Sequence, residues 1–259
     1  MPNVSWHEDE SGDSLCSRAL DTHYDVDHGR MVITVGGTHP QVLDWCRTLA
    51  EHAFDRWDLE HHNGAHPRFG VVDVLPLVPY GIDESTARVA AAELSRSIEA
   101  LGVPVYTYDR ADSKGRTLPE LRRFLRTTAH AAHPTAGVVC LGIRDPLVAF
   151  NVNLRCPIGA AREIARAIRT QEIRALGFEL PSRGLVQVSM NLIQPERVGP
   201  RAAFDRVVSL ARDRQLELVN CEVVGLVPHP ILPELEGLPL RRPVRSIEQA
   251  LEERELRQR

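Results

Sequence analysis

The second half of the chain alternates between short apolar runs and amphipathic stretches in a regular order. Four runs rich in β-branched residues predict strands: LVAFNVNL, IRALGFEL, GLVQVSMNLI and LELVNCEVVGLV. Residues 158–170 and 200–214 repeat their apolar positions at helical spacing, which predicts two helices. The order β-α-β-β-α-β is typical of a ferredoxin-like unit, in which one antiparallel sheet carries both helices on one face.

The first half shows the same alternation less regularly. Four apolar runs predict strands: MVITVGG, VVDVLPLVPY, VPVYTY and GVVCLGI. Helical spacing over residues 38–57 and 83–101 predicts two helices that begin near Thr38 and Asp83, and a short basic helix is expected around RTLPELRRFLR. We therefore predict an α/β (α+β) protein of two ferredoxin-like α/β sandwich subdomains, with a ligand groove between their sheets.

The spacing of apolar residues also predicts which face of each helix is buried. In the first helix this face holds Val42, Trp45, Cys46, Leu49, Ala53 and Trp57. In the second helix it holds Val89, Leu94, Ile98 and Leu101. The charge run RRFLR of the third helix is instead typical of a solvated face.

The change of rhythm near residue 145 predicts a domain boundary. We expect an N-terminal subdomain over residues 1–145, a C-terminal subdomain over residues 146–232 and a C-terminal helical tail over residues 233–259. Residues 1–17 are polar and acidic with little periodicity, so they form either a frayed start or a short strand followed by a loop.

The charge balance and the composition exclude two broad classes of function. The formal net charge of −4 argues against a general nucleic-acid or membrane-surface binder, which would be basic. No segment approaches the roughly 18 apolar residues of a membrane span, and the N-terminus shows no basic apolar leader. The five cysteines are widely spaced without a CxxC pair, which is typical of reduced thiols. We expect a soluble cytoplasmic protein without nucleic-acid or membrane partners.

The strongest candidate for chemistry is the loop HPRFG, which leads into a predicted buried strand. A residue before proline is extended, so the imidazole of His66 projects sideways from the chain, and Arg68 projects on the same side two residues later. The loop therefore places a titratable base beside a cation at the start of a buried strand.

Two other interpretations of this loop stay open. A His-Pro-Arg triplet in a polar stretch is often only a solvated connection. The crowding of His61, His62 and His66 also suggests zinc, but no H-E-x-x-H or paired-cysteine pattern accompanies them, so we expect no metal site.

A polar stripe runs along two predicted strands of the second half. Asn151 and Asn153 are two residues apart and share one face of their strand, and Gln187 and Asn191 share a face of another. An unpaired buried amide costs about 1–3 kcal/mol, so these side chains either bind a ligand or satisfy each other or a loop backbone.

Six blocks resemble, in this order, the formiminotransferase domain of the glutamate formiminotransferase and formiminotransferase-cyclodeaminase family. The blocks are HPRFGVVDVLPLVP, LGVPVYTYDRAD, RTLPELR, GIRDPLVAFNVNL, VQVSMNLI and CEVVGLVP. The resemblance extends from about Leu20 to Pro228. It implies two α/β subdomains that flank a folate-binding groove, with residues 1–145 and 146–232 as the N-terminal and C-terminal formiminotransferase subdomains.

The resemblance implies transfer of a formimino group between N5 of tetrahydrofolate and the amino group of L-glutamate, within one-carbon metabolism and in the direction of histidine breakdown. Tetrahydrofolate, as 5-formiminotetrahydrofolate, would be the cosubstrate, a small amine or amino acid the other partner, and a homodimer is plausible for the family. The stretch between RTLPELR and His133 is shorter than in typical members. Two alternatives follow: formimino or formyl transfer to a different amine, for example in biosynthesis, and a non-catalytic folate-binding homologue.

The resemblance also implies roles for individual residues. The catalytic histidine of the family's HPR motif falls on His66, whose base form would remove a proton from the incoming ammonium, with Arg68 as its catalytic partner. The expected cofactor-binding residues are His133, Pro134, Thr135, Ala136, Gly137, Arg144, Asn151 and Asn153. The expected substrate-binding residues are Arg30, Asp73, Gln187 and Asn191, and the carboxylate that assists could be Asp25, Asp27 or Asp73.

Overall fold

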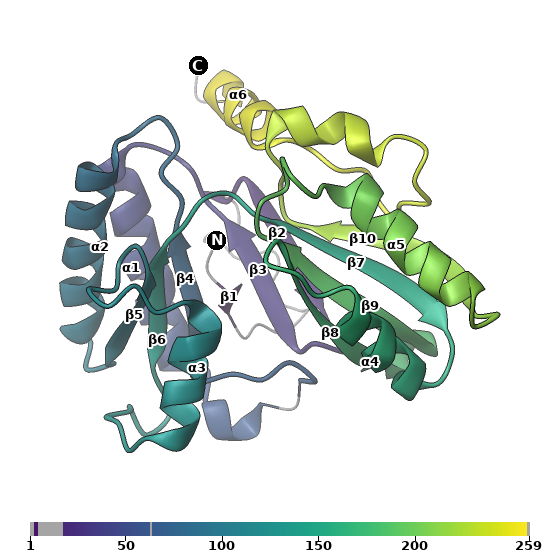
Figure 1. Ribbon diagram of the computed structural model, residues 1–259. Coiled ribbons are helices and arrows are strands. Elements are labelled where there is room, and N and C mark those ends of the chain that lie inside the picture. Colours follow the sequence, from purple (N-terminus) through teal and green to yellow (C-terminus); the bar gives the residue numbers. More distant parts are fainter. Residues whose placement is uncertain (1–2, 5–17, 63, 258–259) are drawn as a thin grey trace. The chain divides into compact units, whose positions relative to one another are not determined.

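The computed structural model describes residues 3–4, 18–62 and 64–257, so most of the N-terminal stretch 1–17 lies outside the described residues. The chain divides into two compact units between Asp145 and Pro146. Each unit is a layered arrangement of a sheet and helices, which confirms the predicted α/β class (Figure 1).

The second unit has one antiparallel sheet of four strands in the order β10-β7-β9-β8. Its strands are β7 (Val148–Arg155), β8 (Ile173–Leu180), β9 (Leu185–Leu192) and β10 (Glu217–Val224). Helices α4 (Ile158–Ala167) and α5 (Pro200–Arg212) cover one face of this sheet (Figure 1). The element order and the pairing confirm the ferredoxin-like plan for this half.

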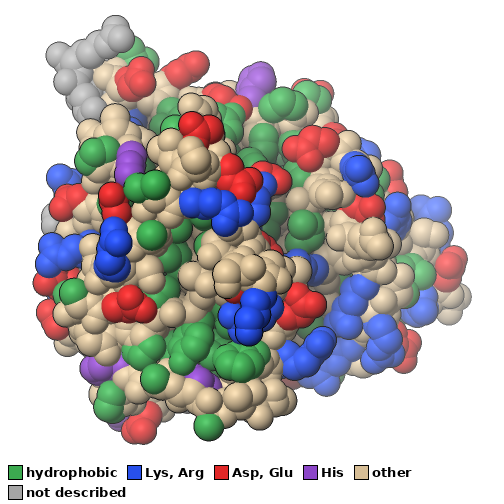
Figure 2. Space-filling model, turned by 60° about the vertical axis from the view of Figure 1, so that its left-hand side comes forward, with side chains coloured by type: hydrophobic (Ala, Val, Ile, Leu, Met, Phe, Trp, Pro, Cys, Tyr) green, Lys and Arg blue, Asp and Glu red, His purple; other side chains and the backbone are tan. Residues whose placement is uncertain are grey.

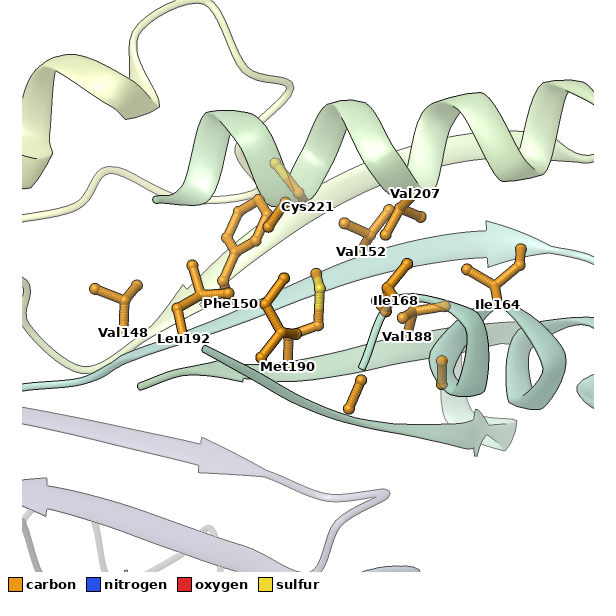
Figure 3. Packing of buried hydrophobic residues seen from close by; sticks show 14 of the residues in the cluster. Val148, Phe150, Val152, Ile164, Ile168, Val188, Met190, Leu192, Val207 and Cys221 are labelled. Atoms are coloured by element: carbon orange, nitrogen blue, oxygen red, sulfur yellow. The ribbon is translucent and has the colours of Figure 1, made fainter. Parts of the chain in front are cut away.

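Alternation along β7 separates an apolar face from a polar face. Val148, Phe150 and Val152 are fully buried in the apolar cluster, and Figure 3 shows Val152 beside Val207 of α5. The residues between them point to the opposite face of the sheet. Because the polar stripe occupies that opposite face, the helices meet only apolar side chains of β7.

We expect Phe150→Ala to lower the free energy of unfolding by about 3–5 kcal/mol, because a fully buried ring is replaced by a cavity. Leu176→Ala is the control, since Leu176 is 44% exposed and its loss should cost little. Chemical denaturation followed by circular dichroism measures both. Equal losses would contradict the assignment of Phe150 to the core.

A C-terminal segment covers the outer edge of β10. Cys221 N donates to Pro239 O at 2.9 Å, and Arg241 N donates to Cys221 O at 2.8 Å. Further along, Ile247 N donates to Val227 O at 2.8 Å as the chain enters α6 (Ile247–Arg257). The stretch between the short 3-10 helix η5 (His229–Leu235) and α6 therefore extends the sheet edge.

The first unit is built around a six-stranded mixed sheet in the order β2-β3-β1-β4-β6-β5. Its strands are β1 (Asn3–Val4), β2 (Asp21–Asp25), β3 (Arg30–Thr34), β4 (Val72–Leu77), β5 (Val105–Asp109) and β6 (Val139–Ile143). Strand β6 is parallel to β4 and β5, because helical crossovers connect these strands. This parallel part departs from the four-stranded antiparallel plan expected by analogy with the second half.

Helices cover both faces of this sheet. Helices α1 (His39–Arg56) and α2 (Glu84–Glu99) pack on one face, and α3 (Leu118–Thr127) packs on the other (Figure 1). The expected burial of Val89 is wrong, since its side chain is 54% exposed. Ala87, Ala90 and Ala91 take its place, because Ala90 and Ala91 each lie three or four residues from both Ala87 and Leu94 and so share the buried helix face.

The side chains on the surface and the state of the cysteines can be compared with what the composition predicted. In the face shown in Figure 2, basic and acidic side chains are interspersed with apolar ones. No helix within the described residues is both long and apolar enough to cross a membrane. The described cysteines are free thiols: Cys46, Cys140, Cys156 and Cys221. Burial raises the pKa of Cys46 to about 11, which keeps this core thiol protonated.

Candidate active site

The loop that carries His66 is tied to the first unit at both ends. Before it, Ala65 N donates to Asp27 O at 3.1 Å. After it, Phe69 N donates to Asp73 Oδ1 at 2.9 Å. The histidine therefore sits on a short segment of backbone between two fixed points, as the sequence predicted for a loop at the start of a strand.

The hairpin between β2 and β3 closes against this loop. Arg68 donates through Nη2 to Gly29 O, so its guanidinium holds the turn of the hairpin. Gly29 has φ of +59°, a backbone conformation that favours glycine. A Cβ on Gly64 would lie 2.1 Å from His28 O, so the two backbones meet at a distance that only glycine permits.

His66 is half-buried and is held as a neutral base. Its Nδ1 lies 3.0 Å from Pro67 O, and because a carbonyl only accepts, Nδ1 carries the hydrogen and Nε2 carries the lone pair. Burial lowers the pKa of His66 well below its ordinary value, and the guanidiniums of Arg30 and Arg122 lower it further. The ring of His28 lies edge-on at 6.3 Å between centroids.

Three guanidiniums gather around one buried carboxylate. Burial lowers the pKa of Arg30 and of Arg68 to about 10, while Asp73 opposes the shift in both cases. Arg30 and Arg68 therefore stay charged at neutral pH, and Arg122 donates to the same carboxylate. The Nε atoms of Arg68 and Arg122 are buried donors without a hydrogen-bond partner among the described residues.

Arg122 corrects the expectation of a solvated RRFLR face. It donates through Nη2 to Asp73 Oδ2, and its side chain is only 13% exposed. Arg123, the next residue on α3, is exposed as expected. The run therefore contributes one cation to the interior and leaves its neighbour in solvent.

The predicted folate loop is a tight turn: His133, Pro134, Thr135, Ala136 and Gly137. His133 and Gly137 exchange backbone hydrogen bonds of 2.8 and 3.0 Å across it. The Nδ1 of His133 accepts from Ala136 N at 3.1 Å and lies 3.3 Å from Thr135 N. This imidazole therefore closes the turn with one nitrogen and, when neutral, carries its hydrogen on Nε2.

This turn is paired with the strand that leaves the His66 loop. Val71 N donates to Ala136 O at 3.0 Å, and Val138 N donates to Phe69 O at 2.9 Å. A Cβ on Gly70 would lie 2.0 Å from Val138 O, so glycine is required for this approach. The end of the His66 loop and the 133–137 turn, which are far apart in the sequence, are thus joined within the first unit.

Arg144 lies at the other end of β6. The 133–137 turn precedes this strand, whereas Arg144 follows it, and five strand residues span roughly 16 Å at about 3.3 Å each. Its Nη1 donates to Asp145 O at 2.9 Å, and its side chain also bonds Tyr108. The structure therefore does not bring Arg144 to the His66 loop, because strand direction separates them.

The histidines near this loop have partners other than a metal. The Nε2 of His62 accepts from Gly64 N at 3.1 Å, and Nδ1 of His61 lies 3.5 Å from an oxygen of Asp58. Over residues 18–62 and 64–257, no group of three or more His, Cys, Asp or Glu is arranged to hold a metal ion. These contacts do not favour the zinc interpretation.

The polar stripe of the second unit forms a hydrogen-bonded network. Gln187 donates through Nε2 to Asn153 Oδ1 at 3.0 Å and to Glu222 Oε1 at 2.8 Å. Asn153 in turn donates to Asn220 Oδ1 at 2.7 Å, and Asn151 Nδ2 lies 3.5 Å from Glu222 Oε1. Of the two interpretations given for the stripe, these contacts fit mutual satisfaction.

Glu222 is the charged centre of this network and is 1% exposed. Arg241 donates through Nη1 to Glu222 Oε2 at 3.2 Å, and Arg183 Nη1 lies 3.6 Å from Oε1. Asn191, which was expected in the same stripe, is exposed. It lies opposite Ala149 in the register, toward the end of the strand pair.

Four residues of these clusters were not expected from the sequence: His28, Arg122, Asn220 and Glu222. Glu222 and Asn220 are two residues apart on β10 and so share one face of that strand. The same two-residue spacing that identified the stripe on the other strands could therefore have identified them. Arg122 lies within the block RTLPELR, but its charge run looked like an ordinary helix surface.

The chain matches known protein families over most of its length. Residues 13–144 match the model of the formiminotransferase domain, N-terminal subdomain, and residues 149–237 match the model of the formiminotransferase domain. The chain belongs to the formiminotransferase family. This confirms the resemblance drawn from the six sequence blocks.

Named relatives support the assignment to the formiminotransferase family. The chain is 32% identical over 241 residues to glutamate formimidoyltransferase of Streptococcus pyogenes serotype M1, covering 81% of this chain and 78% of that protein. It is 30% identical over 244 residues to glutamate formimidoyltransferase of Thermoplasma acidophilum, covering 83% and 80%. The formimidoyltransferase-cyclodeaminase of Sus scrofa is 33% identical over 267 residues, which is 88% of this chain but 49% of that protein.

In this formiminotransferase-family protein, we expect His66 to titrate well below 6.5, and Arg30→Gln to move its pKa upward, because removing a nearby cation stabilises the imidazolium. Imidazole resonances followed by NMR across pH measure this. Arg88→Gln is the control, since Arg88 lies on the exposed face of α2 and pairs with Glu84. A wild-type His66 with an ordinary pKa would contradict the effect of burial and of the nearby guanidiniums on this imidazole.

For the second unit, we expect Glu222→Ala to lower the free energy of unfolding by about 3 kcal/mol, because it leaves buried amides and two guanidiniums without their acceptor. Glu217→Ala is the matched control on the same strand. Glu217 pairs with Arg155 at the surface, and losing such a pair costs about 0–1 kcal/mol. Denaturant unfolding measures the free energy of unfolding of both variants. Equally small decreases in the two would show that the network contributes no stability.

Proposed function

We propose that the protein is a folate-dependent formiminotransferase that moves a formimino group between N5 of tetrahydrofolate and the amino group of L-glutamate, with His66 as general base. The observation that carries the proposal is the imidazole of His66 held beside a cluster of guanidiniums, where burial and the charges of Arg30 and Arg122 lower its pKa, in a family member. Relatives with names of this activity support the choice of substrate.

The transfer requires a group that takes a proton and gives it back. An amino group is an ammonium at neutral pH and attacks only after it loses a proton. In a neutral His66 with its hydrogen on Nδ1, the Nε2 lone pair can take that proton and return it to the nitrogen that departs. Because the pKa of His66 lies well below 6.5, the base form predominates from about pH 6.5 upward.

The guanidinium cluster fits the anions that both substrates carry. Folate ends in a glutamyl tail, and the acceptor is itself an amino-acid dicarboxylate. Carboxylates are matched by the planar fork of arginine, and the buried Nε donors of Arg68 and Arg122 are of the kind that such an anion satisfies. Bound folate would supply the N5 nitrogen that carries the one-carbon group; the residues proposed to hold its carboxylates are Arg30, Arg68 and Arg122.

Anion binding would also tune the base. A carboxylate placed against Arg30 and Arg122 offsets the positive charge that lowers the pKa of His66. The pKa of His66 then rises toward its ordinary value, and the imidazole becomes a stronger base once substrate is present. In this proposal the same arginines bind the substrates and adjust the proton acceptor.

The other predicted contacts are part of the proposal to different degrees. The 133–137 turn is paired with the strand after His66, which supports a role for it beside the base. Asn151, Asn153 and Gln187 already bond one another and their neighbours, so a ligand there would have to compete with these bonds. Arg144, at the far end of β6, is the least supported.

We expect His66→Ala to lower kcat for formimino transfer at least 100-fold, because general acid–base groups contribute about 10²–10⁴ in rate. The melting temperature should be unchanged, since His66 lies in a loop outside the apolar clusters. His61→Ala is the control, because that imidazole is exposed in the neighbouring short helix.

The rate of transfer is measured with purified protein, 5-formiminotetrahydrofolate and glutamate. Binding affinity is measured by calorimetric titration with 5-formyltetrahydrofolate. Full binding with lost turnover in His66→Ala is the expected result. Wild-type turnover in that variant would remove His66 from the reaction. A wild-type protein that neither binds 5-formyltetrahydrofolate nor transfers the group would overturn the proposed function.

A further inference from the structure

Asp73 joins two elements that approach it from different parts of the chain. It lies near the start of β4, and its side chain is 3% exposed. One oxygen accepts the backbone hydrogen of Phe69, which ends the His66 loop, and the other accepts Nη2 of Arg122 on α3. The carboxylate is therefore a bridge between the loop and the helix.

The backbone groups around this bridge are used in different ways. Pro67 has no backbone N–H, so it cannot add a hydrogen bond within the loop. Phe69 uses its carbonyl to accept from Val138 N, and its N–H is taken by Asp73. Asp73 Oδ1 is thus the side-chain contact that ties the Phe69 end of the loop to β4, beside the backbone pairing of Phe69 with Val138.

Stability alone is a weak reason for such a pair in the interior. Burying two charges costs solvation that their attraction does not always recover, and apolar residues of similar volume often stabilise a fold as well or better. A charged pair with several hydrogen bonds does, however, impose one geometry. The pair is better suited to fixing the position of a loop than to strengthening the core.

Arg122 has a second effect on the same loop. Its guanidinium is one of the cations that act on His66, and its partner Asp73 determines where that charge lies. The Asp73–Arg122 contact therefore sets the position of a charge on α3 that acts on the pKa of His66.

We propose that Asp73 and Arg122 form a positioning pair that fixes the His66 loop on β4 and couples it to α3. This inference rests on the proposed function, because it assigns the pair to the placement of the proposed base. It changes the role of Asp73 from the substrate contact expected from the sequence to a residue that acts through His66.

The kinetic test uses Asp73→Asn, Arg122→Gln and the double variant, with Arg123→Gln as the matched control on the exposed side of α3. Each single variant should lower kcat about 10–100-fold, because a small misplacement of a reacting group is costly. Asp73→Asn should change KM little, and the double variant should lose no more than the worse single variant, because the two residues act as a unit. Additive losses, or wild-type kcat with only a lower melting temperature, would overturn the pair as a positioning device.

Hydrogen exchange tests the same inference without any reaction. In the wild type the Phe69 amide should be protected, and Asp73→Ala should lose this protection at least tenfold while the Val138 amide, which donates to Phe69 O, stays protected. An unprotected Phe69 amide in the wild type would overturn the inference even if every variant failed to fold. If the wild type transfers no formimino group, the proposed function fails, and the exchange result still decides whether the pair holds the loop.

Discussion

A carboxylate taken out of water must be met by donors, and this requirement organises the polar interior of each unit. In the first unit, Asp73 draws a loop backbone and the guanidinium of Arg122 to the start of β4. In the second, Glu222 draws Gln187 and two arginines to the face of the sheet opposite the helices. Each carboxylate thus determines where residues from several elements must lie, which apolar packing alone would leave less defined.

Much of the fold could be predicted from the sequence because most elements carry their own period. The second unit was read correctly from four apolar runs and two helical patterns. Strand β2 was missed because DTHYD is polar at most positions and gives no apolar alternation. The parallel pairing of β6 with β4 and β5 was missed, because the alternation of strands and helices from β4 to β6, which is typical of parallel strands, was interpreted by analogy with the antiparallel second half.

In the candidate site, features that depend on neighbouring residues could be predicted from the sequence, whereas contacts between distant residues could not. The extended conformation at His66 follows from the proline beside it, and the six blocks pointed to the same residue. Arg122 is 49 residues from Asp73, and a charge run has the same appearance whether it faces solvent or a buried partner. For Arg144 the opposite problem arose. It is close in sequence to the 133–137 turn and was therefore assigned to the same site, but strand β6 lies between them and places them at opposite ends.

The covered edge of β10 bears on how the second unit is made. A ribosome delivers β7 before the other strands of this sheet, yet β7 lies between β9 and β10 and must wait for the last strand to arrive. Strand β10 itself presents an open edge until the stretch around Pro239 and Arg241 has been synthesised. The first unit, in contrast, has all its strands long before translation ends. During that interval the nascent second sheet offers unpaired backbone groups along β10, and pairing with Pro239 and Arg241 later removes this exposed edge.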